Sequence, residues 1–142
     1  MTDTNANKKT VTSFIDRLFS QGDVTAVDDY LSDDFVNDDP PFGASADREG
    51  MRLAGAKFRA AFPDWHSEVH LLIGEDHLVA EVFTARGTHR GAMMGEAPSG
   101  REVTLRGINV FRVHDGRISE RWGRLDDLGF LKHLGLAPIP GT

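Results

Sequence analysis

Residues 101–126 combine ionisable, amide and aromatic side chains in an alternation typical of one wall of a ligand pocket. Asp115-Gly116 lies between two β-rich runs and favours a type I′ hairpin turn, because both central residues of that turn need positive φ. If His114 pairs with Arg117, then Asn109 faces Trp122, and alternation places a whole set of side chains on one face of the sheet. That face carries Asn109, Phe111, Glu120, Trp122, Arg124 and Asp126.

This composition suits acid/base chemistry on an apolar ligand. A carboxylate half-buried beside an indole ring has its pKa raised by desolvation, as a general acid or base near neutral pH requires. Asp126 is the candidate, because it ends the last predicted strand. Structural interpretations remain open for the same residues: Asp126 as the cap of a following helix, Glu120 with Arg124 as an ion pair at the rim, and Trp122 as part of the core.

The composition excludes several classes of partner and site. The chain has 142 residues, no cysteine, and 16 Lys and Arg against 22 Asp and Glu, for a formal net charge of -6. This charge disfavours nucleic acid and anionic membranes, and without cysteine there are no disulfides or thiolate metal sites. No stretch approaches the ~18 apolar residues of a membrane span, and no histidine pair or acidic loop has metal-ligand spacing. We therefore expect one cytoplasmic domain over residues 1–142, with no metal.

Hydrophobic periodicity predicts the elements that position these residues. Helical spacing covers about residues 11–19, 23–31 and 51–62, and a short helix is expected over residues 128–134. Runs rich in β-formers predict strands over residues 66–73, 78–90, 101–113 and 117–126. Helices followed by an antiparallel meander predict an α+β fold.

The other face of the predicted sheet has more aliphatic surface than a solvated face should have. Because of it, we expect a homodimer that packs through this face, with arginines pairing with acids at its rim. The face carries Ile108, Val110 and Leu125, together with Arg106, Arg112 and Arg121.

Several short motifs together identify a family resemblance. Over nearly the whole chain, their order and spacing resemble those of the SnoaL-like polyketide cyclases of the NTF2-like superfamily. The resemblance implies a cone-shaped α+β barrel, with N-terminal helices packed on a curved, mostly antiparallel sheet around one deep pocket, a short C-terminal helix and often a dimer. The motifs are Phe62-Pro63-Asp64-Trp65, Gly87-Thr88-His89-Arg90-Gly91, Pro98-Ser99-Gly100-Arg101, Gly107-Ile108-Asn109-Val110-Phe111-Arg112, Asp115-Gly116-Arg117-Ile118 and Trp122-x-x-x-Asp126.

The resemblance also implies an activity and its residues. Family cyclases close a ring in a hydrophobic carbonyl substrate by an intramolecular aldol reaction without metal or organic cofactor, and Asp126 lies at the position of their acid/base aspartate. For the histidine that assists this aspartate, His89 is the best candidate, and a structural imidazole is the alternative interpretation. Independently of the resemblance, Met93 and Met94 in the loop of residues 91–100 suggest an apolar lid over a pocket, with ordinary packing as the alternative.

Two departures from the family pattern concern the site. The chain reads Asn37-Asp38-Asp39 where many members have a histidine in the middle position, and His133 replaces a usual glutamine. Asn37 and Asp38 are therefore candidate substrate contacts, with a carboxylate at residue 38 in place of the imidazole of many family members.

Other functions remain open on the same scaffold. One is a non-catalytic module that binds a small molecule, because fold alone does not determine function. Another is an enzyme of the epoxide hydrolase or ketosteroid isomerase type, and a hydrolase would need a second acid and a water-holding amide, for which Asp38, Asn37 and Asn109 are candidates. The number of carboxylates in the pocket distinguishes these functions. One carboxylate favours the aldol reaction, two carboxylates near one water favour hydrolysis, and a pocket without a carboxylate favours binding alone.

Overall fold

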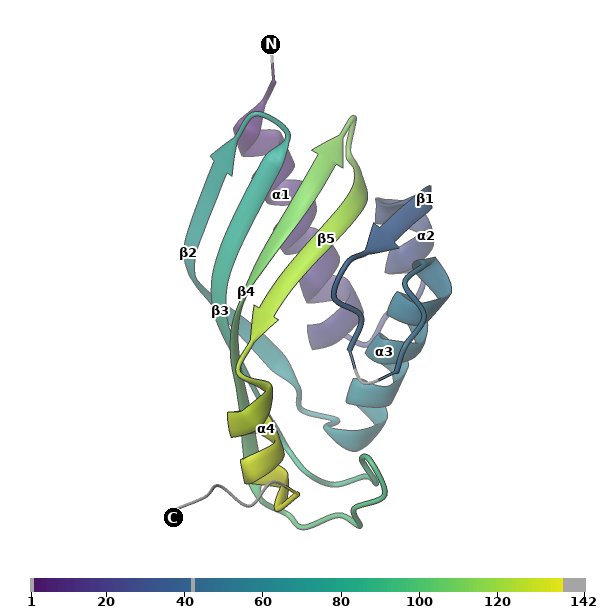
Figure 1. The fold of residues 1–142 in the computed structure, drawn as a ribbon, viewed down its shortest axis with the longest axis vertical. Helices are drawn as coiled ribbons and strands as arrows, with labels where there is room; N and C mark the ends of the chain where they lie inside the picture. The colour runs from purple at the N-terminus through teal and green to yellow at the C-terminus, as the bar shows by residue number, and fades with distance from the viewer. Residues whose placement is uncertain (1, 42, 137–142) are drawn as a thin grey trace.

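The computed structural model describes residues 2–41 and 43–136 of the chain. A long first helix is followed by a short helix, the first strand and a third helix, after which four further strands and a short helix complete the described chain (Figure 1). The elements are α1 (Thr4–Ile15) continued by a π-helical turn η1 (Asp16–Ser20), α2 (Ala26–Tyr30), β1 (Leu31–Asn37), α3 (Arg48–Ala61), β2 (His66–Glu75), β3 (Leu78–Thr88), β4 (Glu102–His114), β5 (Arg117–Leu125) and α4 (Asp127–Leu134).

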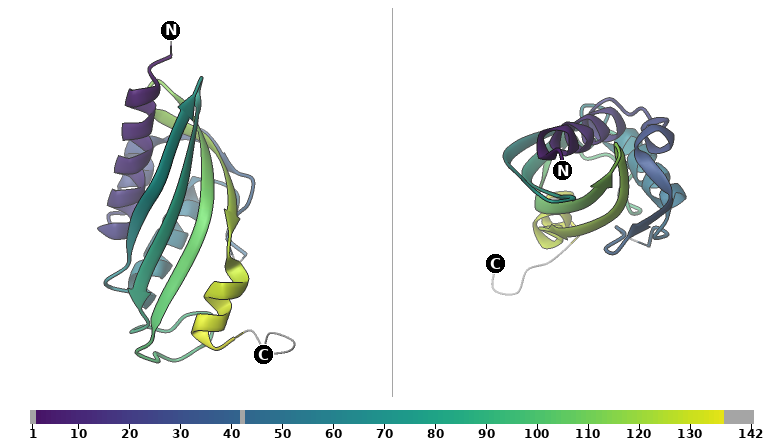
Figure 2. Two further views of the ribbon diagram at one scale, coloured as in Figure 1. Left: turned by 90° about the vertical axis from the view of Figure 1, so that its left-hand side faces the viewer. Right: turned by 90° about the horizontal axis from the view of Figure 1, so that it is seen from above.

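The five strands form one curved sheet in the order β1-β5-β4-β3-β2. The expected antiparallel meander of β2 to β5 is confirmed, as is the α+β class. The sheet curves around α1, so its concave side faces the helices (Figure 2). Within the described residues, no helix is long and apolar enough to cross a membrane.

The acidic stretch after residue 23 differs from the prediction. We expected one helix over residues 23–31, but α2 ends at Tyr30 and the chain continues as β1, which runs parallel to β5. Leu31, Phe35 and Asn37 are buried, while Asp33, Asp34 and Val36 are exposed, and the pairing register shifts between Leu31 and Val36. The available edge of β5 provides backbone partners for this segment, and that pairing outweighs its local helical pattern.

A β-bulge changes the faces of β5. Next to the turn the predicted pairing is confirmed, with Val113 opposite Ile118, but Arg112 pairs with Glu120 and leaves Ser119 without a partner. One extra residue turns every later side chain of the strand to the opposite face. Asn109 consequently faces Gly123, one position from the predicted Trp122.

Beyond the bulge, the prediction of which β5 side chains face the cavity and which face outward is therefore wrong. Asn109 and Phe111 face inward as expected, and they are joined by Arg121 and Leu125, which were expected outside. The residues that the bulge moves to the outer face are Glu120, Trp122 and Arg124.

Candidate functional site

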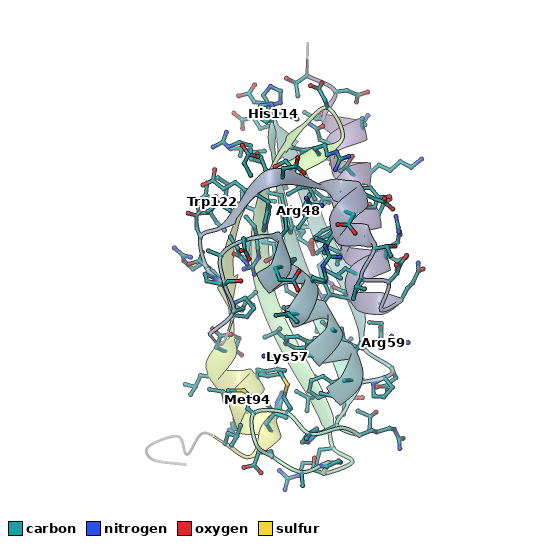
Figure 3. All side chains as sticks on the ribbon, turned by 90° about the vertical axis from the view of Figure 1, so that its right-hand side faces the viewer. Arg48, Lys57, Arg59, Met94, His114 and Trp122 are labelled. Atoms are coloured by element: carbon teal, nitrogen blue, oxygen red, sulfur yellow. The ribbon has the colours of Figure 1, made fainter. Side chains whose placement is uncertain are left out.

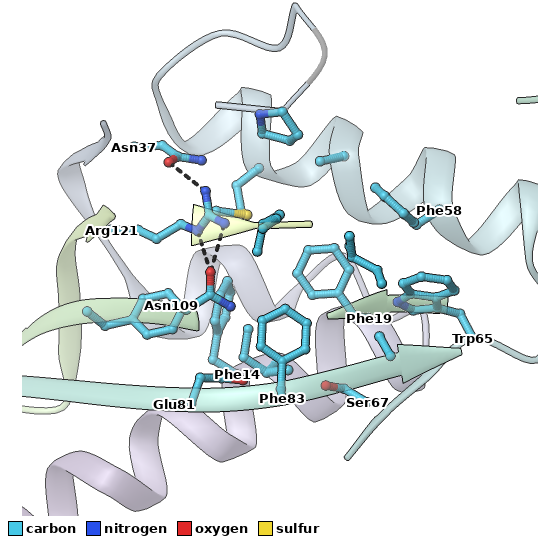
Figure 4. A pocket seen from close by; sticks show the side chains of 18 of the residues that line it. Phe14, Phe19, Asn37, Phe58, Trp65, Ser67, Glu81, Phe83, Asn109 and Arg121 are labelled. Carbon is cyan, nitrogen blue, oxygen red and sulfur yellow. Dashed lines mark hydrogen bonds between the residues drawn. The ribbon is translucent and has the colours of Figure 1, made fainter. Parts of the chain in front are cut away.

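A cavity of about 80 Å³ lies between the concave side of the sheet and the helices (Figure 4). Most of its wall is aromatic or aliphatic, which follows from the inward alternation of the strands and the apolar faces of α1 and α3. Such a wall excludes water and strengthens electrostatic interactions inside it. The apolar lining includes Phe14, Phe19, Met51, Phe58, Trp65, Phe83, Phe111 and Leu125.

Glu81 places a carboxylate in this apolar wall. It lies on β3 between the inward residues Val79 and Phe83, its exposed fraction is 0%, and neither carboxylate oxygen has a hydrogen-bond partner in the described structure. Burial raises the pKa of Glu81 to about 7, an effect that the charge of Arg121 opposes. A carboxyl with this pKa can both accept and return a proton near neutral pH. The hydroxyl of Ser67, also on the cavity wall, likewise lacks a hydrogen-bond partner among the described residues.

Arg121 is the fixed cation of the cavity. Its Nε and Nη2 donate to the Asn109 amide oxygen at 3.0 and 2.7 Å, and its Nη1 donates to the Asn37 amide oxygen at 3.0 Å and to the Asp39 carbonyl at 2.8 Å. The residue is only 7% exposed, and burial lowers its pKa, although nearby carboxylates including Glu81 oppose this. A guanidinium stays charged at neutral pH under these conditions, so the side chain is a preoriented positive group.

A second carboxylate lines the cavity at the start of α4. Asp127 makes no side-chain hydrogen bond or ion pair in the described structure, and burial raises its pKa while Arg121 lowers it. The same residue borders an outer compartment of about 500 Å³, which also includes Asp38, Asp39 and Arg124. Asp39 is committed there, because it accepts from the Gly123 backbone at 2.9 Å and from Arg124 at 2.7 Å.

Asp126, the predicted acid/base, has a structural role in this geometry. Its carboxylate accepts from the backbone N–H of Gly129 at 2.9 Å and caps α4. Its side chain is exposed and is not among those that line the cavity. The helix-cap interpretation is thus the one that the hydrogen bond supports.

The other predicted site residues are divided among several places. Asn37, Asn109 and Phe111 line the cavity, Asp38 and Arg124 line the outer compartment, and Glu120 and Trp122 lie on the outer face of the sheet. Trp122 packs there against Arg112, whose guanidinium lies 5.5 Å from the ring centre.

His89 and Met93 belong to a second hydrophobic region near the end of α3. His89 is fully buried against Phe62, its Nδ1 lies 3.1 Å from the Ser99 hydroxyl, and its Nε2 lacks a partner among the described residues. Met93 is buried in the same region, and Met94 lies at the α4 end of the molecule, far from His114 at the other end (Figure 3). Neither His89 nor Met93 lines the cavity.

Three site residues were missed by the sequence prediction: Glu81, Arg121 and Asp127. A signal for Glu81 was present, since it is the charged member of an otherwise apolar alternation from Val79 to Ala85. To predict Arg121 as a cavity residue, the position of the bulge would have to be known. To predict Asp127, the direction in which the chain leaves β5 would have to be known. No group of three or more His, Asp or Glu side chains in the described chain is arranged to hold a metal ion.

Comparisons with known proteins agree with this architecture. A family model described as SnoaL-like polyketide cyclase matches residues 9–134. IdmH from Streptomyces antibioticus is 33% identical with a TM-score of 0.75, over 91% of this chain and 98% of that one. AclR from Streptomyces galilaeus is 25% identical with a TM-score of 0.85, over 98% and 87% of the two chains. TsrD from Streptomyces laurentii is 23% identical with a TM-score of 0.84, over 96% and 100%. No curated protein matches the chain.

Proposed function

Because the chain belongs to the SnoaL-like polyketide cyclase family, we propose that it closes a ring in a hydrophobic carbonyl compound by an intramolecular aldol reaction, or performs related lyase or isomerase chemistry. In this proposal Glu81 is the acid/base and Arg121 stabilises the enolate. The observation that carries it is the buried carboxylate of Glu81, which has no hydrogen-bond partner in the described structure and faces an apolar cavity beside a fixed guanidinium.

The reaction divides into steps that these groups can perform. The Glu81 carboxylate removes a proton from a carbon between two carbonyls, and the electron pair moves onto oxygen as an enolate that Arg121 stabilises. The enolate carbon then attacks a further carbonyl of the same molecule, distant from the two that flank it, which forms one carbon–carbon bond and leaves an alkoxide. The alkoxide takes the proton back from Glu81. The ring closure is redox-neutral, so its balance needs no oxidant, reductant or metal.

Preorganisation is the main contribution of the remaining cavity. The apolar wall holds a flexible chain in a folded geometry, which replaces an entropic cost that the free chain would meet during ring closure. Asn37 and Asn109 act as positioning residues, because they fix the Arg121 guanidinium through their amide oxygens. With its amide oxygen committed in this way, Asn109 keeps its amide N–H groups for a ligand.

The test measures proton abstraction directly. A 1,3-dicarbonyl probe in deuterated water exchanges its central proton for deuterium, and NMR follows this exchange without requiring the natural substrate. We expect Glu81→Gln to lower the enzyme-catalysed exchange rate by at least about 100-fold, since the amide keeps the shape but cannot accept the proton. Glu68→Gln, a matched change on the exposed side of β2, should keep the wild-type rate.

Other outcomes separate the remaining functions. If wild-type protein binds the probe and catalyses no exchange, the chain is a binding module and the catalytic proposal fails. A second candidate is epoxide hydrolysis, which the presence of Asp127 as a second carboxylate beside Arg121 favours. That activity would incorporate ¹⁸O from labelled water into a diol product, whereas ring closure incorporates none.

The assembly and location are also proposals. We infer a homodimer through the outer face of the sheet and, as expected from the composition, a cytoplasmic protein. Two rows of paired apolar residues cross this outer face from strand to strand. One row is Leu71, Val82 and Ile108, and the other is Ile73, Ala80, Val110 and Trp122. Leu71, Ile73 and Ile108 are 56%, 58% and 44% exposed, which supports a partner on this surface.

A further inference from the structure

The outer compartment continues directly from the catalytic cavity. Both are bordered by Pro41, Arg121, Leu125 and Asp127, so these side chains form the neck between an inner and an outer space. The inner cavity measures about 80 Å³, whereas the outer compartment, which we call the vestibule, measures about 500 Å³. Sites that enclose a drug-sized ligand measure roughly 300–1,000 Å³. A substrate of that size therefore cannot place more than its reacting end beside Glu81.

The two spaces differ in chemistry as well as in size. The inner wall is mainly aromatic and aliphatic, while the vestibule contains three carboxylates and two guanidiniums. Both guanidiniums are largely paired. Arg121 donates to Asn37, Asn109 and the Asp39 carbonyl, which leaves one Nη2 N–H for the enolate. Arg124 donates to Asp39 at 2.7 Å and to the Gly123 carbonyl at 2.8 Å.

The groups of the vestibule without a cationic partner are acceptors. Asp127 has no side-chain hydrogen bond or ion pair in the described part of the chain. Asp38 pairs with no arginine there, and its carboxylate lies in hydrogen-bond contact with the Glu120 carboxyl, a contact that raises the pKa of Glu120. A ligand with hydroxyl or ammonium groups would satisfy these oxygens, whereas a carboxylate or phosphate would meet an excess of negative charge.

We propose that the vestibule is a second binding subsite of the same enzyme, which takes the non-reacting end of the substrate, and that this end carries hydroxyl or amino groups and no negative charge. The substrate is then an amphipathic carbonyl compound, with an apolar dicarbonyl end in the inner cavity and a hydrogen-bond-donating tail at the neck and beyond. This inference depends on the proposed function, because it assumes that the reaction takes place at Glu81.

The experiment compares one dicarbonyl probe with four tails. The reacting end stays constant, and the tail is absent, a neutral polyol, a primary ammonium or a carboxylate. Exchange kinetics should give a KM about tenfold lower for the polyol and ammonium probes than for the tailless probe, with kcat changed by less than about threefold, because the tail binds equally in the ground and transition states. The carboxylate probe should show no gain over the tailless one.

Two charge variants test whether the effect of the tail on KM arises in the vestibule. Asp38→Asn, in the vestibule, should raise KM for the ammonium probe about fivefold and leave the tailless probe unchanged. Asp115→Asn makes the same change in the β4–β5 turn at the far end of the sheet, where φ is 50° and asparagine is tolerated. This variant should change KM for neither the ammonium probe nor the tailless probe.

The results distinguish failure of this inference from failure of the proposed function. Equal KM values for all tails, or the lowest KM for the carboxylate, would overturn the subsite and its polarity while leaving the exchange of the tailless probe intact. If Glu81→Gln retains full exchange on the tailless probe, the proposed function itself fails.

Discussion

At the scale of single residues, Glu81 and Asp126 show two ways in which a protein uses a carboxylate. Asp126 gains a backbone N–H partner at 2.9 Å and so stabilises the fold. Glu81 loses its water shell and gains no partner in the described structure. An ionised group in that position opposes folding, and such a cost is characteristic of sites where function, rather than stability, sets the environment.

The pH dependence of stability should reveal this cost. Glu81 has an ordinary pKa of 4.5 and a pKa of about 7 in the folded protein, so the folded state holds the proton more tightly. Its contribution to stability is complete below about pH 4.5 and is lost as the pH rises through about 7. We expect Glu81→Gln to abolish this loss, which amounts to roughly 3 kcal/mol. Urea unfolding of both proteins at pH 4.5, 6 and 8 measures the difference, and parallel stability curves would contradict the raised pKa.

In the proposed mechanism, the same group also determines the pH profile of activity. As the base, Glu81 must be ionised, so kcat/KM for proton exchange should rise with pH and level off above about 7. A profile that is flat between pH 5 and 8 would remove Glu81 from the proton-transfer step.

Asp126 offers a sharp contrast, because its two interpretations predict different results for one variant. As a helix cap, Asp126→Asn should preserve both stability and turnover, since asparagine caps about as well as aspartate, and Asp126→Ala should cost about 1 kcal/mol. As the acid/base, Asp126→Asn should keep the fold and lose most of the turnover. A thermal melt together with the exchange assay distinguishes the two interpretations. We expect Asp126→Asn to preserve both stability and turnover.

At the scale of secondary-structure elements, sequence patterns predicted the strands better than their faces. Alternation and the Asp115-Gly116 turn predict β3, β4 and β5 to within a few residues, because these signals are local. The bulge at Ser119 has no comparable signal, and that single residue turns Arg121 into the cavity and Trp122 out of it. β1 was missed for a related reason: its structure depends on a partner strand more than 80 residues later in the chain, as the pairing of Leu31 with Ile118 shows.

A glycine on the bulged strand tests whether the position of Arg121 matters. A Cβ added at Gly123 would lie 2.6 Å from Arg121 Cζ, so Gly123→Ala must push the guanidinium away from Asn109. We expect about a 10- to 100-fold loss of kcat with a smaller change in KM, because the displaced cation would no longer meet the enolate oxygen. Arg121→Lys should give a similar loss, since it removes the fork that Asn37 and Asn109 hold. Wild-type kcat in both variants would show that Arg121 has no catalytic role.

At the scale of the whole molecule, the order of helices and strands was enough to predict the architecture, but not the contents of the cavity. Helices before a meander have few ways to cover one face of a curved sheet, so the fold class follows from element order. The cavity depends on the side chains that several elements contribute at once: Phe58 from α3, Glu81 from β3 and Arg121 from β5. Their juxtaposition is set by strand register and sheet curvature, which single-sequence periodicity does not contain.

The opposite face of the same sheet leads to a prediction about assembly. Leu71, Ile73 and Ile108 form part of a continuous apolar surface with Val110 and Trp122, and a solvated monomer rarely exposes such a patch. A two-fold interface would cover it with an identical patch. We therefore expect light scattering at micromolar concentration to give the mass of a dimer.

A charge in the centre of this patch should separate the subunits without unfolding them. Ile108→Arg would place a like charge on each copy of the interface, beside Arg124, which pairs with Ile108 on β5, and should shift the protein to monomer with intact secondary structure by circular dichroism. Leu53→Arg is the matched control, because Leu53 is a similarly exposed aliphatic residue, 49% accessible, on α3 rather than on the sheet, and this variant should remain dimeric. A monomeric mass for the wild-type protein would refute the dimer. A dimer that both variants retain would move the interface away from the sheet, since a buried arginine pair at Ile108 cannot be accommodated in an apolar contact without a counter-charge.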